Sequence, residues 1–292
     1  MSSHSIILFY KYVHIENPEE LKKSQFDLAT RLGLKGRVIV AEEGINATLE
    51  GTTENIATYL QEFLADEKFA NTHIKKSVGT GEAFPKLSVK VRKKIVSLHL
   101  EKDIDPNQIT GKHLPADELK KWFESGKKFK IIDMRNDYEF NVGRFKDSIM
   151  PNLQNFRDLS KELSKIEDLK DETILTVCTG GVRCEKASGL LVREGFKDVY
   201  QLNGGIVTYM EKFPAQEFRG TLYVFDRRIT MDFDPKDKHV VVGECGKCGE
   251  KTERYVNCRN PMCNKHFLCC ENCSEEDGRV FCDENCKNLI VR

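Results

Sequence analysis

The sequence predicts a multidomain protein that combines an α+β domain, an α/β domain with a parallel sheet, and a cysteine-rich end. Three observations predict this division. The first hundred residues show strands and helices in the order βαββαβ, residues 116–217 alternate strands with helices, and nine of the 11 cysteines follow residue 244. A chain of 292 residues is long enough for each part to bury a core. We therefore expect domains at 1–98, 116–217 and 218–292, with a linker at 99–115.

The first 98 residues have the pattern of a ferredoxin-like α+β sandwich. Four segments have the apolar or alternating character of strands: 5–15, 37–41, 46–50 and 87–91. Two segments, 18–32 and 53–69, place apolar side chains at helical spacing, and Pro18 and Gly33 mark the ends of the first helix. In the order βαββαβ, both helices pack on one face of an antiparallel sheet. We expect the other face to be free to meet a partner such as RNA.

Two features of this first domain are compatible with RNA binding. The small polar tract 44–48 joins two strands, either as a plain turn or as a place where a nucleotide approaches the backbone. Four basic residues lie in or after the last strand pattern: Lys90, Arg92, Lys93 and Lys94. They either contact phosphates or protect a solvated strand edge. Because 46 basic and 46 acidic side chains cancel over the chain, net charge neither supports nor excludes an RNA partner.

The central segment predicts a parallel sheet flanked by helices. Helix patterns at 117–125, 159–168 and 184–194 alternate with strand patterns at 129–133, 173–177 and 198–201. Strands that alternate with helices pair in parallel, and their carboxyl ends form the ligand-binding edge of the sheet. Cys178 directly follows one strand, and Asp133 and Arg135 lie at the end of another. We expect Asp133 and Arg135 to hydrogen-bond and brace the loop that begins at Cys178.

The loop after residue 177 carries the strongest chemical signal of the chain. Its members are Cys178, Thr179, Gly180, Gly181, Val182 and Arg183. The two glycines allow the backbone to curl so that several N–H groups turn toward the Cys178 sulfur. The positive end of the following helix and the charge of Arg183 both favour a thiolate. We therefore predict a nucleophilic cysteine with a lowered pKa; the alternative is a buried cysteine that ends a core strand.

The length of the loop and its second cysteine refine this prediction. Four residues separate Cys178 from Arg183, fewer than in the Cys-x5-Arg loops that cradle a phosphate dianion. The shorter loop is better suited to a persulfide sulfur than to a phosphate, so we do not expect a phosphatase. Cys184 either resolves a persulfide or sulfenate on Cys178 into a disulfide or simply packs against the sheet.

The cysteines of the last part are paired as in zinc sites. The pairs are Cys245 with Cys248, Cys258 with Cys263, Cys270 with Cys273, and Cys282 with Cys286. Such spacings place two thiolates on one side of a tetrahedral Zn²⁺ ion. We expect two structural zinc sites, in which the first pair joins the third and the second pair joins the fourth. The alternative is disulfides in an oxidised preparation. This tail is too polar to bury much core without metal.

The sequence indicates a cytoplasmic protein without a membrane partner. The apolar stretch near the N-terminus is too short for a signal peptide and has no basic lead-in. No run approaches the roughly 20 apolar residues of a membrane span. A reactive thiol loop without an export signal indicates a reducing compartment.

Several segments resemble known families. The Asp-x-Arg-x-x-x-Glu pattern at 133–139, the loop at 178–183 and the Leu-x-Gly-Gly pattern at 202–205 resemble the rhodanese family. Together with Glu43-Gly-Ile-Asn46, the segment 224–228 and the cysteine-rich tail, they make nearly the whole chain similar to the bacterial tRNA uridine hydroxylase family. This resemblance implies O2-dependent conversion of the wobble uridine, position 34 of tRNA, to 5-hydroxyuridine. It also implies that Cys178 is the essential residue, as a thiolate or a persulfide, and that the tRNA anticodon region is the partner.

Two other functions stay open at this point. A rhodanese-type sulfurtransferase would pass sulfane sulfur through a Cys178 persulfide, and a noncatalytic RNA-binding adaptor would not need Cys178. The sequence contains no flavin fingerprint, haem ligand motif or iron-binding triad that we can place. O2 is therefore expected as a co-substrate only because of the resemblance. The sequence identifies neither an electron or sulfur donor nor an oligomeric state.

Overall fold

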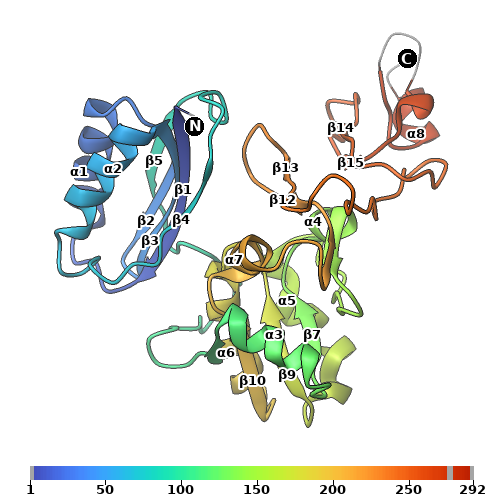
Figure 1. Ribbon diagram of the computed structural model, residues 1–292, viewed down its shortest axis with the longest axis horizontal. Helices are drawn as coiled ribbons and strands as arrows, with labels where there is room; N and C mark the ends of the chain where they lie inside the picture. The colour runs from blue at the N-terminus through green and yellow to red at the C-terminus, as the bar shows by residue number, and fades with distance from the viewer. Residues whose placement is uncertain (1–2, 275–278, 290–292) are drawn as a thin grey trace.

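The computed structural model describes residues 3–274 and 279–289 and divides into three parts. An N-terminal sheet with two helices, a central sheet surrounded by helices, and an irregular C-terminal part follow one another along the chain (Figure 1). The predicted fold class is confirmed. In the described residues no helix combines the length and the apolar character that a membrane span requires.

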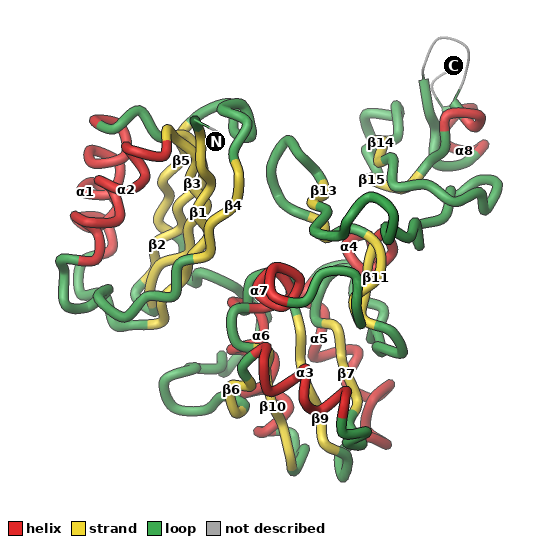
Figure 2. Tube along the Cα trace, in the orientation of Figure 1, coloured by secondary structure: helices red, strands yellow, loops and turns green. Residues whose placement is uncertain are grey.

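The N-terminal part has the ferredoxin-like arrangement with one added strand. Its elements are β1 (His4–Tyr12), α1 (Pro18–Arg31), β2 (Lys35–Ala41), β3 (Gly44–Thr52), α2 (Thr53–Leu64), β4 (Lys75–Val78) and β5 (Leu87–Val91). The strand order is β4-β1-β3-β2-β5, in which β5 pairs in parallel with β2 and the other pairs are antiparallel. Both helices cover the same face of the sheet (Figure 2). Side chains of Ile7 and Phe9 are buried beneath them in the domain core.

The structure corrects three details of this domain. The strand predicted at 87–91 is the added strand β5, and the strand that completes the motif is β4, which the sequence analysis missed. Strand β4 has four residues, two of them lysines, and therefore lacks an apolar pattern. The helix predicted at 53–69 ends at Leu64. The tract 44–48 is part of strand β3, not a turn, and Gly44 fits there because a Cβ would lie 1.9 Å from the Lys11 carbonyl oxygen.

The second face of this sheet is not free, contrary to expectation. Side chains of β1 on this face lie directly against the loop that follows residue 177. A Cβ on Gly180 would lie 2.7 Å from Leu8 Cδ2, and one on Gly181 would lie 2.8 Å from Tyr10 Oη. The sheet face therefore covers the Cys178 loop.

The central part contains the predicted parallel sheet. Its strands are β6 (Lys112–Leu114), β7 (Lys130–Asp133), β9 (Thr173–Val177) and β10 (Asp198–Leu202), and its main helices are α3 (Ala116–Glu124), α4 (Asp137–Val142), α6 (Val182–Arg193) and α7 (Gly205–Lys212). The strand order is β6-β10-β9-β7, with every pair parallel. Strand β6 and the buried Ile104 come from the segment expected to be a linker. Leu98, expected to end the first domain, is also buried in the central core. The helix predicted at 159–168 is instead a short α5 (Leu159–Glu162) followed by a 3-10 helix (Leu163–Leu169).

The C-terminal part contains little regular structure. Strand β11 (Phe218–Gly220) pairs with β8 (Gly143–Phe145), and the remaining elements are β12 (Leu222–Tyr223), β13 (Thr230–Met231), β14 (Tyr255–Asn257), β15 (His266–Leu268) and α8 (Glu284–Asn288). The β12–β13 hairpin reaches the N-terminal sheet, where Arg228 donates to Ser77 Oγ at 3.1 Å and to the Val78 carbonyl at 3.2 Å. The small buried cluster of the tail consists mainly of cysteines.

Candidate active site

Cys178 lies where β9 ends and the backbone turns into α6. Gly181 is the N-cap of that helix and has a φ of 102°, a left-handed conformation that glycine adopts without steric cost. The turn directs the Gly181 N–H toward the sulfur, and it donates to Cys178 Sγ at 3.2 Å. The helix begins at Val182, two residues earlier than expected, so Arg183 lies in its first turn.

The surroundings of Cys178 favour its thiolate. Burial alone would raise the pKa of Cys178. A hydrogen bond from the Cys184 thiol, the charge of Arg183 and the N–H groups of Cys184 and Gly181 together lower that pKa to about 6. Burial and the hydrogen bond with Cys178 raise the pKa of Cys184, so Cys184 keeps its proton. Cys184 is fully buried in the central core, and a resolving role for it stays a prediction.

Arg183 is held by a buried carboxylate. Its guanidinium donates to the two carboxylate oxygens of Glu139 at 2.5 and 2.7 Å, and to Thr179 Oγ1 at 3.2 Å. Burial favours the protonated form of Glu139, but the charge and hydrogen bonds of Arg183 hold the pKa of Glu139 below its usual value. The positive charge of Arg183 is therefore shared between Glu139 and the sulfur. The pair also ties the Cys178 loop to α4.

Asp133 and Arg135 form a second ion pair, which supports the segment that carries Glu139. Arg135 Nη2 donates to Asp133 at 2.7 Å, and both side chains are completely buried. The same guanidinium donates to the carbonyl oxygens of Glu139 at 3.2 Å and of Gly143 at 2.7 Å. These contacts place Asp133 and Arg135 behind α4, from where they support the loop through Glu139.

A cavity of about 540 Å³ separates the N-terminal sheet from the Cys178 loop. Cys178 and Gly180 line one side, and Asn46 and Thr48 of β3 line the other. Such a volume is typical of pockets for small ligands and nucleotides. The Cys178 residue exposes 0% of its surface to water, so its sulfur lies just beneath the cavity floor.

Aromatic and basic side chains surround the opening of this cavity. Phe156 and Phe225 line it, and Phe225 is 46% exposed. Arg37 of β2 and Arg157 also line it, and both are exposed. In the part of the chain that the structure describes, neither arginine forms an ion pair. The cavity therefore combines stacking surfaces with uncompensated positive charge.

Buried polar contacts fix the N-terminal sheet on the central part. Tyr10 Oη donates to Glu185 on α6 at 3.0 Å. The fully buried Lys186, also on α6, donates to Glu43 at 2.8 Å and to Asp103 at 2.6 Å. The two sides of the cavity are thus joined by contacts that water screens weakly.

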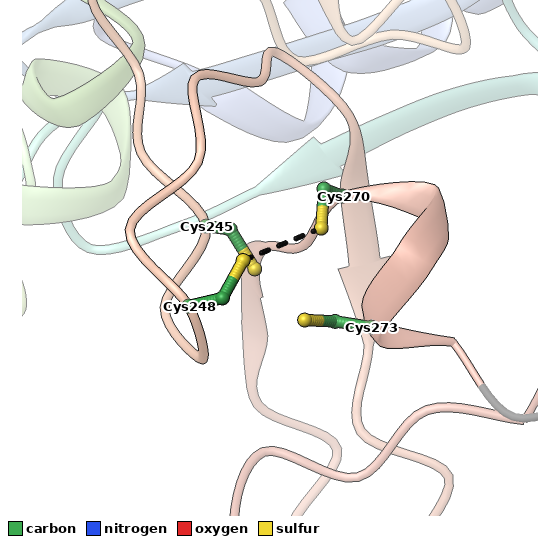
Figure 3. Close-up of side chains that lie close together, drawn as sticks. All are labelled: Cys245, Cys248, Cys270 and Cys273. Carbon is green, nitrogen blue, oxygen red and sulfur yellow. Dashed lines mark hydrogen bonds between the residues drawn. The ribbon is translucent and has the colours of Figure 1, made fainter.

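Eight cysteines of the tail form two separate clusters. In the first, Cys245, Cys248, Cys270 and Cys273 turn their sulfurs toward one another (Figure 3). In the second, the same is true of Cys258, Cys263, Cys282 and Cys286. All sulfurs of a cluster lie within 4.8 Å of one another. This is the grouping expected above, in which the spacing defined the four pairs.

The sulfur distances suit a tetrahedral metal ion. Four sulfurs at about 2.3 Å from Zn²⁺ would be about 3.8 Å apart. The distance from Cys248 to Cys270 is 3.6 Å, and the distance from Cys263 to Cys282 is 3.7 Å. Cys269 points elsewhere, toward the Cys270 carbonyl oxygen, and His266 stacks on Tyr255. The donor set therefore fits two metal ions, each held by four thiolates.

Three family models match successive parts of the chain. They are the UPF0176 acylphosphatase like domain at residues 4–95, the Rhodanese-like domain at 115–212 and the Rhodanase C-terminal model at 219–287. A curated tRNA uridine(34) hydroxylase from Bacillus licheniformis is 43% identical and aligns over 100% of this chain and 92% of its own length. Proteins of the same name from Bacillus velezensis and Bacillus mycoides are 41% and 45% identical, over 98% and 97% of this chain and 90% and 88% of their own lengths.

The chain belongs to the tRNA uridine(34) hydroxylase family.

In this member of the tRNA uridine(34) hydroxylase family, the basic residues proposed as RNA contacts have different surroundings. Three are exposed: Lys90, Arg92 and Lys93. Lys90 lies in register with Ile39, which lines the cavity. Lys94 is paired instead, since its Nζ lies 3.2 Å from carboxylate oxygens of both Glu43 and Asp103. The charge of Lys94 is therefore neutralised by carboxylates within the protein.

Sequence analysis missed several residues of this site, among them Glu139, Arg37 and Arg157. Glu139 could have been recognised from the sequence, because it closes the Asp-x-Arg-x-x-x-Glu pattern at 133–139. No sequence pattern marks Arg37 or Arg157, because only the packing of the N-terminal sheet on the central part brings them to one cavity.

Proposed function

We propose that this protein hydroxylates C5 of uridine 34 in the anticodon region of tRNA and consumes O2. The printed names of its relatives support this substrate. The observation that carries the proposal is the nucleotide-sized cavity above a cysteine whose thiolate is favoured. We place the reaction in the cytoplasm, where tRNA is found.

The cavity suits a single nucleotide of an RNA loop. Bases in single-stranded loops can be splayed out, stacked on aromatic rings and hydrogen-bonded at their edges. The exposed Phe225 offers a stacking surface, the largely buried Phe156 adds to the apolar wall, and Asn46 offers an amide that can pair with a uracil edge. Arg37 and Arg157 are placed to contact the phosphates on either side of the base.

Cys178 acts in this proposal by activating the uracil ring. Its sulfur adds to C6, which makes C5 electron-rich and open to oxidation, and it leaves again when the C5–C6 double bond reforms. One oxygen atom of O2 enters the C5–H bond and the other leaves as water, with two electrons and two protons from a cellular reductant. A persulfide on Cys178 would bring its outer sulfur about 2 Å closer to the cavity. The thiolate and the persulfide are both compatible with the loop.

We infer that the two cysteine clusters bind Zn²⁺ as structural ions. Each cluster offers four thiolates and no open position for a reacting molecule. The ions would hold the tail and, through it, the β12–β13 hairpin that contacts the N-terminal sheet.

Nucleoside analysis of tRNA tests the proposed function. We expect 5-hydroxyuridine to disappear from tRNA when the gene is removed and to return with the gene only in the presence of O2. Return of the nucleoside without O2, or its presence without the gene, would contradict the proposal. Return with a Cys178→Ser gene would favour the adaptor function.

A sulfurtransferase activity is the second candidate, and the six-residue loop favours it. The Gly181 N–H and the first turn of α6 would stabilise a persulfide as well as a thiolate. Transfer of sulfur from thiosulfate to cyanide at rates typical of enzymes, without 5-hydroxyuridine formation, would support this function instead.

A further inference from the structure

Lys75 is a lysine that the fold buries. It lies on β4, across from Leu8 on β1, and the residue is 5% exposed. Leu8 in turn rests on Gly180 of the Cys178 loop. In the part of the chain that the structure describes, no carboxylate forms an ion pair with the Lys75 ammonium. A buried ammonium without a counter-ion is costly, and a nearby anion would offset part of that cost.

The surroundings of Lys75 place it beside the active loop. Its Nζ lies 4.8 Å from the ring centre of Tyr10, whose hydroxyl rests on Gly181. Lys75 also lines a small cavity of about 70 Å³ together with Thr179, the residue after Cys178. The hairpin side of this cavity carries Asp226 and Arg228, which pair with each other at 2.7 Å.

Four titratable groups interact electrostatically with this ammonium. They are Cys178 in the loop, Glu185 on α6, Glu211 on α7 and His73 before β4. Glu185 already accepts hydrogen bonds from Tyr10 at 3.0 Å and from Gln201 at 2.9 Å. Burial lowers the pKa of Lys75 to about 8, and Cys178 is the first of the anions that act against this shift. Lys75 shares a cavity wall with Thr179, and it packs beside Leu8 and Tyr10, which rest on Gly180 and Gly181. This geometry places the ammonium beside the loop that carries the Cys178 sulfur.

We propose that Lys75 provides the counter-charge for the sulfur anion at position 178. The ammonium stabilises the thiolate, or the outer sulfur of a persulfide, and the anion in turn stabilises the buried ammonium. Lys75 is a positioning residue, since it acts through Cys178 and not on the uridine. The inference rests on the ionised sulfur that the proposed function uses, but not on tRNA.

The pH dependence of Cys178 alkylation tests this role. Iodoacetamide would be added to the full-length protein at a series of pH values, and peptide mass spectrometry would give the rate at Cys178 alone. We expect Lys75→Met to raise the pH of half-maximal rate by about one unit, which is about a fivefold slower reaction at pH 6 and about tenfold at pH 5. Lys75→Arg keeps the charge and should stay near the wild-type profile. Lys76→Met, at the exposed neighbouring position, is the matched control and should match the wild type.

An unchanged profile in Lys75→Met would overturn the proposal. If that variant does not fold, Lys75→Gln replaces it. A second measurement changes Cys178 instead of Lys75, by a nearly isosteric substitution. Cys178→Ser removes the anion, so Lys75 should lose its proton more readily and react with acetic anhydride several-fold faster at pH 7; equal rates would also overturn the proposal. None of these measurements uses tRNA. A negative result for Lys75 would therefore not contradict the proposed hydroxylation, and a lack of 5-hydroxyuridine would not contradict the role of Lys75.

Discussion

The contact between Gly180 and Leu8 gives a quantitative test of how the N-terminal sheet covers the active loop. A Cβ on Gly180 would lie 2.7 Å from Leu8 Cδ2. Because carbon atoms pack at about 3.5 to 4.0 Å, the loop or Leu8 must move by roughly 1 Å in a Gly180→Ala variant. Overpacking of this kind costs about 1 to 3 kcal/mol. In a Leu8→Ala background the clashing atom is absent, so we expect the cost of Gly180→Ala to fall by about 1 to 2 kcal/mol.

Urea unfolding followed by tryptophan fluorescence measures this cost. Trp122 is the single tryptophan of the chain and is 6% exposed in the central core, so its emission reports unfolding of the part that carries the loop. The midpoint should shift to lower urea in Gly180→Ala with little change in slope. Gly246→Ala is the control, since its nearest neighbouring atom would lie at 3.6 Å. If Gly180→Ala has the same cost with and without Leu8, the sheet does not rest on the loop and the cavity described above is wrong.

Three further predictions concern the thiol, its supporting ion pair and the metal sites. The alkylation rate of Cys178 should rise with pH around a midpoint of about 6 and level off above it, because the folded protein lowers the pKa of this thiol; a midpoint near 8.5, as in a free cysteine, would contradict this. Glu139→Gln leaves Arg183 buried without its anion and should lower the free energy of unfolding by about 3 to 5 kcal/mol, whereas Glu194→Gln, at the exposed C-terminal end of the helix α6 that carries Arg183, should change it little; comparable urea midpoints for both variants would show that the pair is unimportant. Metal analysis should find two zinc ions per chain, about one in Cys258→Ser and two in Cys269→Ser, because only Cys258 belongs to a cluster; equal zinc contents in the two variants would refute the assignment.

The sequence predicted the elements whose signals are local. The strand before Cys178 and the helix after it have strong patterns, and two glycines mark the turn between them. Short spacings also predicted the four cysteine pairs, and the structure joins them in the expected grouping, although spacing alone does not determine which pairs join. These features depend on residues that are close together in the chain.

Features that depend on the packing of distant segments could not be predicted. Strand β4 is short and polar, and it is recognisable only by its pairing with β1. Asn46 was within the tract 44–48 given as a possible place of nucleotide approach, but the sequence could not show which cavity it lines. Arg37 looked like an ordinary strand residue, and it lines the cavity only because the N-terminal sheet lies on the Cys178 loop. The same is true of Lys75, whose burial follows from that packing and not from the surrounding sequence.

The most direct test of the account is whether the sulfur at position 178 is required for hydroxylation by the purified protein. Wild type, Cys178→Ser and the control Cys269→Ser would each be incubated with unmodified tRNA, O2 and a reductant, and 5-hydroxyuridine at position 34 would be quantified by mass spectrometry. We expect product with wild type and Cys269→Ser and none above background with Cys178→Ser. Product formation by a folded Cys178→Ser protein at the wild-type rate would show that the thiol beneath the cavity does not act on the uridine.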